Sequence, residues 1–257
     1  MTKDTINIYP IAMRMPEDSH PAVKVPLMAA VIETANDLIM VDTGSPGNGD
    51  FFAQLIALQF QPSAFSLVIN THAHIDHVGN NRDFASARIV ASQIDYEHAK
   101  SFSHTLLQSD DIVRTLTDYF PHANSRRIEA SAAHLLDMAK KYWRDDILGP
   151  PSHISWIEDG ADLPDYISLL PTPGHTPAHY SLLVHGRNLS FIIAGDAMPS
   201  RLFWKRRLRE LIPRYDTELF SASKATIEAL SGIVMGGHDR PFWTENLSYL
   251  DSNKVEI

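Results

Sequence analysis

Cysteine is absent from the 257-residue sequence. The chain therefore has no disulfide framework, no thiolate metal ligand and no cysteine nucleophile. It also lacks any run of about 18 apolar residues, and its N-terminal residues contain no apolar stretch of the kind found in a signal peptide. We therefore expect a cytoplasmic protein that does not span or bind a membrane.

Positive charge is scarce as well. The chain has 22 Lys and Arg against 31 Asp and Glu, which gives a formal net charge of -9. This balance argues against wholesale binding of nucleic acid or anionic membrane, although a local basic patch remains compatible with either. Hydrophobic residues make up 44% of the chain, enough for a sizeable core. The length suits one layered α/β unit, so we expect a single domain over residues 1–257.

Apolar periodicity divides the chain into strand-rich and helical parts. Short β-branched runs predict strands at 6–13, 27–34, 38–42, 65–70 and 88–91, and again at 153–157, 167–170, 180–184, 189–194 and 233–235. A helix is expected at about 216–230. The stretch at about 92–148 repeats its apolar residues at helical spacings and predicts a helical insertion. The insertion forms either a lid or dimer surface, or helices packed on the sheet without a part in substrate binding.

The densest group of ligand-type side chains directly follows the strand expected at 65–70. It consists of His72, His74, Asp76 and His77. Imidazole nitrogens and carboxylate oxygens bind Zn²⁺ and related divalent ions. Alternate residues on a tightly turned segment can converge on one ion, whereas the adjacent Asp76 and His77 cannot easily both reach that same ion. The spacing therefore predicts a second metal ion beside the first.

Three further expected strands are followed at once by a His or Asp in a Gly-containing turn. These side chains are His175, Asp196 and His238. A single histidine after a strand is usually an ordinary loop residue. Four strand ends of this kind in one chain are hard to explain by coincidence, so the pattern predicts that they build a common site.

At this point the sequence resembles the metallo-β-lactamase superfamily. The resemblance is carried by His72-x-His74-x-Asp76-His77, Pro173-Gly174-His175, Gly195-Asp196 and Gly237-His238, in the family's order, together with the turn Asp42-Thr43-Gly44. It covers the chain apart from the insertion and implies an αββα sandwich with the metals at one edge of the two sheets. It also implies that His72, His74 and His175 hold one metal, that Asp76, His77 and His238 hold the other, and that Asp196 bridges them.

Such a ligand set is typical of a catalytic centre. Seven groups leave open positions on two ions, and the ions would lower the pKa of bound water and polarise a carbonyl or phosphoryl oxygen. We expect Zn²⁺, although the donor set also suits Fe, Mn or Co. Asp76 would ligate and also act catalytically, by orienting the hydroxide or passing its proton to the leaving group. Asp42 is either a partner of a ligand histidine or a buried carboxylate that caps the turn at Gly44.

Two substrate classes remain open. The first is a small ester, lactone or related acyl compound attacked by a metal-bound hydroxide. Quorum-signal lactonases of the family commonly place a Tyr shortly after the bridging Asp to help the substrate carbonyl. This chain has Ala197-Met198-Pro199-Ser200 there, so that aid is missing or comes from elsewhere.

The second class is a phosphodiester, for a phosphodiesterase or nuclease. A basic stretch at 201–209 follows Asp196 and supplies five candidate substrate contacts, Arg201, Trp204, Lys205, Arg206 and Arg207. Arg and Lys could grip a phosphate, and Trp204 could stack on a base or an acyl group. The alternative is a solvated helix face that pairs with acidic neighbours or a partner subunit.

We prefer the small-molecule acyl substrate over nucleic acid and allow for a homodimer. A non-catalytic metal-binding protein is the third reading. Loss of a ligand would favour it, and no ligand position of the family pattern is lost here.

Overall fold

The computed structural model describes residues 5–14, 26–121, 123–205 and 215–257. One sheet has the strand order β12-β1-β2-β3-β4-β5-β6. Its strands are β1 (Asn7–Arg14), β2 (Pro26–Glu33), β3 (Leu38–Val41), β4 (Leu67–Ile69), β5 (Arg88–Ala91), β6 (Ile154–Trp156) and β12 (Val255–Glu256). From β3 to β6 neighbouring strands run parallel, so the carboxyl ends of β3 and β4 lie at the same edge.

The other sheet has the order β11-β10-β9-β8-β7. Its strands are β7 (Ile167–Pro171), β8 (Tyr180–His185), β9 (Ser190–Gly195), β10 (Ile233–Gly236) and β11 (Asp239–Trp243). Only β9 and β10 pair in parallel among these strands, while the other described pairs are antiparallel. The turns that follow β9 and β10 therefore leave the sheet side by side.

Alternation along the strands explains how the two sheets pack. In β3, Ile39 and Val41 belong to the core cluster that both sheets share, whereas Met40 faces the opposite side. The same cluster contains Phe191 and Ile193 of β9, which belong to the other sheet. Side chains at successive positions thus fill two different apolar layers.

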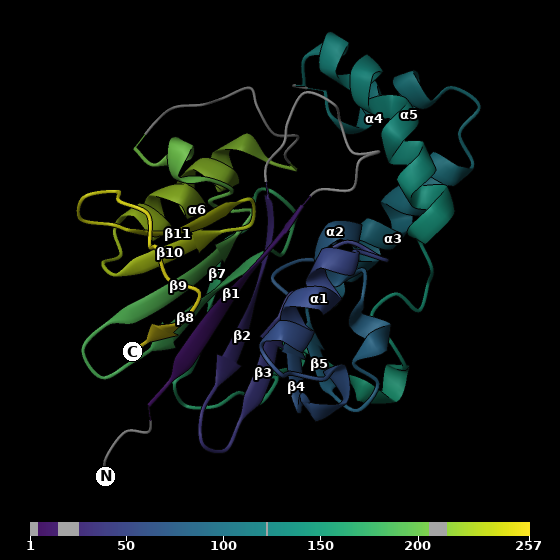
Figure 1. The fold of residues 1–257 in the computed structure, drawn as a ribbon. Coiled ribbons are helices and arrows are strands. Elements are labelled where there is room, and N and C mark those ends of the chain that lie inside the picture. Colours follow the sequence, from purple (N-terminus) through teal and green to yellow (C-terminus); the bar gives the residue numbers. More distant parts are fainter. Residues whose placement is uncertain (1–4, 15–25, 122, 206–214) are drawn as a thin grey trace.

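Helices cover the outer faces of both sheets. Helix α1 (Gly49–Ala57) buries Phe51 and Leu55 against the face of Met40. Helix α6 (Thr217–Glu228) buries Ile227 against the second sheet. The resulting order of layers, helix, sheet, sheet, helix, is visible in Figure 1 and confirms the αββα sandwich expected from the sequence.

Residues 93–142 form three helices after the short helix α2 (Ile75–Val78). They are α3 (Gln93–Leu107), α4 (Ile112–Tyr119) and α5 (Ser125–Tyr142). Figure 1 shows α4 and α5 beyond one end of the sheets. These helices have a core of their own, in which Leu106, Leu116 and Ile128 are buried. Five 3₁₀ turns complete the described elements, at Pro62–Ala64, Asn81–Asp83, Pro151–His153, Ile157–Asp159 and Arg201–Phe203.

A second apolar cluster joins this helical region to the loop after β4. It brings Trp143 and Ile147 together with Ala73 and Val78. The helices are therefore anchored beside the histidine-rich loop as well as to each other. In the part of the chain that the structure describes, no helix combines the length and the apolar character needed to cross a membrane.

The small core of the helical region makes it sensitive to cavity formation. Leu116 is 1% exposed, and we expect Leu116→Ala to lower the free energy of unfolding by about 2–4 kcal/mol. Hydrogen exchange should show lost protection first in α4 and α5, while β2 and β9 keep theirs. Val113→Ala, at an exposed position of the same helix, is the control. Equal loss of protection in the sheets would show that the helices do not form a separate stability unit.

Candidate metal centre

The ends of four strands supply the candidate ligands. His72 and His74 lie in the loop after β4, and Asp76 and His77 occupy the first turn of α2. After β7 the chain turns into the loop that carries His175. Asp196 directly follows β9, and His238 follows β10 after one glycine. Because these ends meet at one edge of the sandwich, residues distant in sequence become neighbours.

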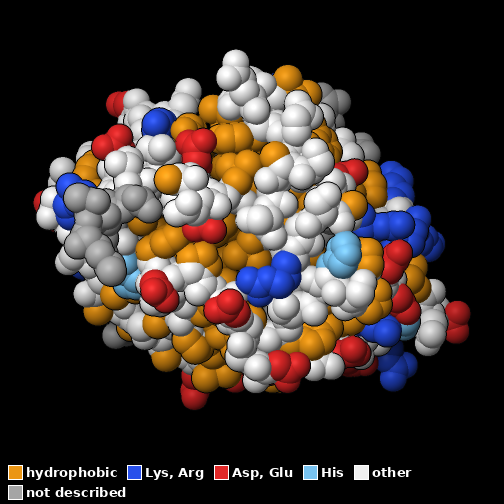
Figure 2. Space-filling view, turned by 90° about the horizontal axis from the view of Figure 1, so that it is seen from below, with side chains coloured by type: hydrophobic (Ala, Val, Ile, Leu, Met, Phe, Trp, Pro, Cys, Tyr) orange, Lys and Arg blue, Asp and Glu red, His pale blue; other side chains and the backbone are white. Residues whose placement is uncertain are grey.

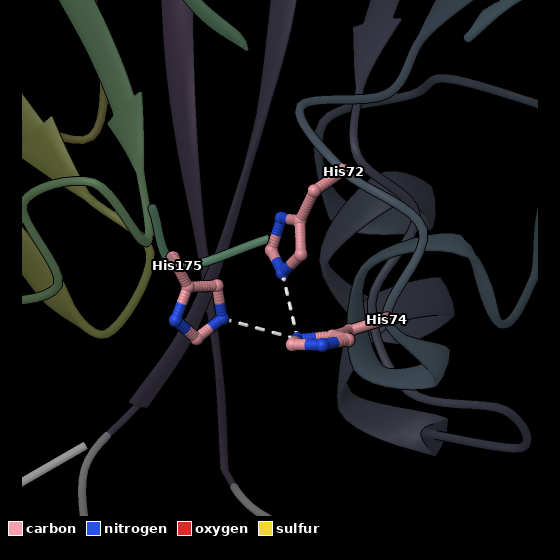
Figure 3. Close-up of side chains that lie close together, drawn as sticks. All are labelled: His72, His74 and His175. Carbon is pink, nitrogen blue, oxygen red and sulfur yellow. Dashed lines mark hydrogen bonds between the residues drawn. The ribbon is translucent and has the colours of Figure 1, made fainter. Parts of the chain in front are cut away.

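Three imidazoles face one another at this edge (Figure 3). The Nε2 atom of His72 lies 3.0 Å from Nδ1 of His74, and Nε2 of His175 lies 3.1 Å from the same Nδ1. One ring nitrogen carries either one hydrogen or one lone pair, so Nδ1 of His74 cannot satisfy both neighbours by ordinary hydrogen bonds. Nitrogens bound to one tetrahedral zinc ion at about 2.0–2.1 Å would lie at a similar separation.

Asp196 lies between this trio and the other ligands. Its Oδ2 atom is 3.2 Å from Nε2 of His175 and 3.3 Å from Nε2 of His238, and its Oδ1 atom is 3.6 Å from Nε2 of His77. His238 in turn lies 4.0 Å from Oδ2 of Asp76. All seven candidate ligands fall into three overlapping groups with ligand atoms within 4.8 Å of one another, namely His72–His74–His175, His72–His77–Asp196 and Asp76–His77–His238.

Two buried atoms at the centre of the cluster point to a bound cation. Nε2 of His77 and Oδ1 of Asp196 have no hydrogen-bond partner among the described residues. Leaving buried polar atoms unpaired is costly, and natural proteins rarely do so without a ligand. A lone pair on nitrogen and a carboxylate oxygen are the donors that divalent metals accept. The residues present therefore fit a metal centre.

The protonation states of three of the histidines also fit metal binding. Burial, with the neighbouring His77 and other histidines, holds the pKa of His72 well below its usual value. Burial and the nearby His175 lower the pKa of His74 to about 4. Burial lowers the pKa of His175 as well, although Asp196 opposes the shift. These three imidazoles are neutral at pH 7 and offer free lone pairs, as metal ligands must.

The two carboxylates are ionised. Burial alone would raise the pKa of Asp196, but the surrounding His238, His175 and His77 outweigh burial and hold it well below the usual range. The pKa of Asp76 is likewise lowered, because the charges of nearby histidines overcome the effect of burial. Anionic oxygens beside neutral imidazoles form a donor set suited to a divalent ion.

Asp42 orients His77. Its Oδ2 atom accepts a hydrogen bond of 2.8 Å from Nδ1 of His77, so Nε2 of that ring faces the cluster. The side chain of Asp42 also accepts from the backbone and the hydroxyl of Thr71, at 2.8 Å each. Burial opposes a charge on His77, but Asp42 outweighs it, with Asp196 and Asp76, and raises the pKa of His77 to about 10, so a cation that binds Nε2 would displace a proton there. The contact with His77 favours Asp42 as the partner of a ligand histidine over Asp42 as a carboxylate that only caps the turn at Gly44.

Asp42, which contacts His77, has an unusual backbone conformation. Its φ angle is 56°, in the left-handed region that few residues other than glycine adopt. Such strain persists where the surrounding contacts hold it, and it is frequent at functional sites. Here the bonds from Thr71 and His77 hold the carboxylate in place.

The comparison with protein families agrees with this geometry. The profile of the Metallo-beta-lactamase superfamily matches residues 26–254. The chain belongs to this superfamily. Among its curated relatives, an N-acyl homoserine lactonase from Bacillus sp is 23% identical over 245 residues, which cover 83% of this chain and 81% of the relative. The uncharacterized protein YobT of Bacillus subtilis (strain 168) is 28% identical over 184 residues, covering 68% and 64%.

Solved structures of the superfamily share the fold. AidC, a dizinc quorum-quenching lactonase, superposes with a TM-score of 0.64 at 14% identity and covers 94% of this chain and 90% of its own. The hydrolase AbOPH superposes with a TM-score of 0.63 at 15% identity, covering 100% and 94%. These similarities establish the superfamily sandwich for this chain.

A carboxylate of α3, which no sequence pattern indicated, supports the candidate metal centre. Asp95 is 1% exposed. Its Oδ2 atom accepts from the backbone N–H of Ala73 at 2.7 Å, and its Oδ1 atom from that of Ala178 at 3.2 Å. It thus joins the loop of His72 and His74 to the loop of His175. The spacing Ser92-x-x-Asp95 signals a helix start, but no local pattern signals a bond to two distant loops.

His179 is a second buried support that the sequence did not identify. Its Nε2 atom accepts from the backbone N–H of Asp196 at 3.1 Å, and its Nδ1 atom pairs with the hydroxyl of Thr172 at 2.9 Å. Gly237 also packs against Asp196, because a Cβ there would come within 2.0 Å of Oδ1. These contacts fix where the carboxylate lies.

Trp204, the aromatic member of the basic stretch, is 4% exposed and packs with its ring centroid 5.5 Å from that of Phe242, so its ring belongs to the core. Stacking of this ring on a substrate stays a prediction, and its burial does not favour it. Arg201 donates to the carbonyl of Leu247 at 2.6 Å and stacks on Tyr249 at 4.0 Å.

Of the remaining basic candidates, the structure describes Lys205. Lys205 is exposed, and its backbone N–H bonds the carboxylate of Glu228. Arg206 and Arg207 lie outside the described residues. The mixture of basic and aromatic residues at 201–209 did not indicate that Trp204 belongs to the core.

Removing the central carboxylate should reduce metal binding. In Asp196→Ala, the cluster loses the oxygens that face three of the histidines, so we expect bound metal per chain to fall by about half or more. Elemental analysis after dialysis measures it. Asp83→Ala removes an exposed carboxylate near the same loop and should leave the metal content unchanged. Wild-type metal content in Asp196→Ala would contradict the assignment.

Asp95 should act on the same centre through the backbone. We expect Asp95→Ala to weaken metal affinity by about 10- to 100-fold, as for other groups that position ligands, and Asp95→Asn to weaken it less because one acceptor oxygen remains. Competition with a chromogenic chelator gives the affinities. Glu97→Ala, an exposed position on α3, is the control. An equal loss in Asp95→Asn and Asp95→Ala, or none in either, would rule out this role.

Proposed function

We propose that this protein is a dinuclear, zinc-dependent hydrolase that cleaves a small ester or lactone and places the acyl part of the substrate in a cavity between the metal centre and the helical region. The observation that carries this proposal is the cavity itself. Its volume is about 340 Å³, and it is lined both by metal-centre residues and by residues of α3, α4 and α5. That volume lies within the range of about 300–1,000 Å³ found for small-molecule sites.

The two ends of the cavity differ in chemistry. One end is polar and is formed by the candidate ligands His74, Asp76, His175, Asp196 and His238. The other end is largely apolar, with Phe102, Leu106, Phe120, Leu135, Met138 and Trp143 among its residues. An acyl compound matches this division, because its carbonyl can lie at the polar end while its chain displaces water from apolar walls.

The charge of the residues that line the cavity bears on whether the substrate is an acyl compound or a phosphodiester. Among the described residues that line the cavity, none is Lys or Arg, whereas Asp76 and Asp196 are both present. A phosphodiesterase needs cationic groups to balance the charge of its transition state. On the face seen in Figure 2, Lys and Arg side chains are interspersed with acidic ones. The described part of the molecule thus favours a neutral acyl substrate over nucleic acid.

Different residues of the chain have different roles in the proposed hydrolysis. Two divalent ions, when bound, activate water and polarise the scissile carbonyl. Asp76 has a side chain that is 29% exposed, against 6% for Asp196, and it lines the cavity. Asp76 therefore meets the substrate, accepts a proton from the attacking water and returns it to the leaving oxygen. Asp196 and His77 keep their positions through His179 and Asp42.

The named relatives support the acyl reading. The curated relatives that match most of the chain include N-acyl homoserine lactonases, and AidC is a dizinc quorum-quenching lactonase. At 23% identity or less these likenesses support a reaction class for this chain and leave the particular acyl compound open.

Hydrolysis assays test the proposal directly. Zinc-loaded protein, chelator-treated protein and chelator-treated protein reloaded with zinc are compared on an acyl lactone and on bis(4-nitrophenyl) phosphate. We expect lactone turnover that disappears with the metal, returns on reloading, and exceeds phosphodiester turnover by at least about 100-fold in kcat/KM. The reverse preference would favour the phosphodiesterase reading. Full metal content without turnover of either substrate would favour a non-catalytic metal-binding protein.

A further inference from the structure

A buried carboxylate lies at the first residue of β11. Asp239 is 8% exposed and does not line the cavity beside the metal centre. Its Oδ2 atom accepts three hydrogen bonds, from the hydroxyl of Ser200 at 2.9 Å, the backbone N–H of Arg201 at 3.0 Å and the hydroxyl of Tyr249 at 3.1 Å. Its Oδ1 atom accepts from the backbone N–H of Arg240 at 2.9 Å. Asp239 therefore joins the loop after β9, the start of β11 and the C-terminal segment.

The loops after β9 and β10 lie against each other beside this carboxylate. The backbone N–H of Gly237 donates to the carbonyl of Gly195, and that of His238 donates to the carbonyl of Pro199, at 2.9 Å each. The bonds of Asp239 extend the same contact by one further residue. The backbone of His238 is therefore held to the loop after β9 on both of its sides.

His238 depends on its backbone more than His77 does. Nδ1 of His77 bonds Asp42, which orients that ring. Nδ1 of His238 is buried and has no hydrogen-bond partner among the described residues. Ligand histidines are usually oriented through the nitrogen that does not bind the metal. The position of Nε2 of His238 therefore follows from the backbone that Asp239 helps to hold.

Two groups of candidate ligands share no residue, namely His72–His74–His175 and Asp76–His77–His238. Asp95 joins the two loops that carry the first group. Asp239 bonds the loop after β9 directly beside His238, a member of the second group. Asp196 has a support of its own, since its backbone N–H bonds His179. The two groups are therefore supported by different buried carboxylates.

Arg201 and Tyr249 support Asp239 from the other side. The guanidinium of Arg201 donates to the carbonyl of Leu247 at 2.6 Å and stacks on the ring of Tyr249 at 4.0 Å. The guanidinium of Arg240 lies over the same ring at 4.5 Å. These contacts hold the ring of Tyr249 without its hydroxyl. Tyr249→Phe therefore removes one bond to Asp239 and keeps the packing around it.

We propose that Asp239 is a positioning residue for His238, and that it sets the affinity for the metal ion held by the second group with little effect on the ion held by the first. This inference rests on the dinuclear centre of the proposed function. Because each group has its own buried carboxylate behind it, the occupancy of the two metal positions can change independently.

Zinc titrations in competition with a chromogenic chelator test this inference. The wild type should bind about two ions per chain. We expect Asp239→Ala to weaken one ion by about 10- to 100-fold and to leave the other unchanged. Asp239→Asn should weaken it less, because an amide oxygen can still accept the three bonds made to Oδ2. Asp251→Ala removes an exposed carboxylate from the same C-terminal segment and is the matched control.

A double-mutant cycle distinguishes positioning from general stabilisation. In a His238→Ala background, Asp239→Ala should not weaken the remaining ion, because Asp239 acts through His238. An equal loss with and without His238 would show a structural role and overturn the inference. If Asp239→Ala does not fold, Tyr249→Phe gives the same comparison, with an expected loss of about 2- to 10-fold that disappears in His238→Ala.

The zinc stoichiometry separates this inference from the hydrolase proposal. Two ions in the wild type, with unchanged affinities in Asp239→Ala, would overturn the inference and leave the dinuclear hydrolase standing. A single ion in the wild type would overturn the dinuclear centre of the proposed function and this inference with it. Neither result depends on the turnover of any substrate.

Discussion

The contact of the buried Asp196 carboxylate with the imidazoles around it is the interaction on which the site depends. His175, His238 and His77 all present a ring nitrogen to its two oxygens, at 3.2, 3.3 and 3.6 Å. Burying so many polar rings is unfavourable unless charge and hydrogen bonds compensate. Asp196 provides that compensation, and its place is set by the backbone at the end of β9 and by His179.

Much of the molecule can be understood as support for this arrangement. Parallel pairing of β3 with β4, and of β9 with β10, brings the following loops to one edge. Asp42 then orients His77 from one of these ends, and Asp95 joins two ligand loops from α3. Such outer contacts determine where ligand atoms lie, because a loop by itself does not hold side chains to within a fraction of an ångström.

The sandwich and the helical region have different roles in this arrangement. The sandwich carries the groups that bind metal, while α3, α4 and α5 supply most of the apolar wall of the cavity. The helices have a small core of their own, and α3 also supports the ligand loops through Asp95. In the proposed function, the strand ends would carry the reaction chemistry and the helices would contact the acyl part of the substrate.

Local periodicity in the sequence indicated the strands and the helical character of 92–148, and ligand residues placed directly after strands predicted a common site. The resemblance to the metallo-β-lactamase superfamily implied the sandwich and the seven ligand positions. Only the tertiary structure decided which distant groups meet. Trp204 belongs to the core, Asp95 supports two ligand loops, and His98 pairs with Tyr119 across two helices. Contacts of this kind depend on how elements pack over long sequence separations, and local sequence patterns do not contain that information.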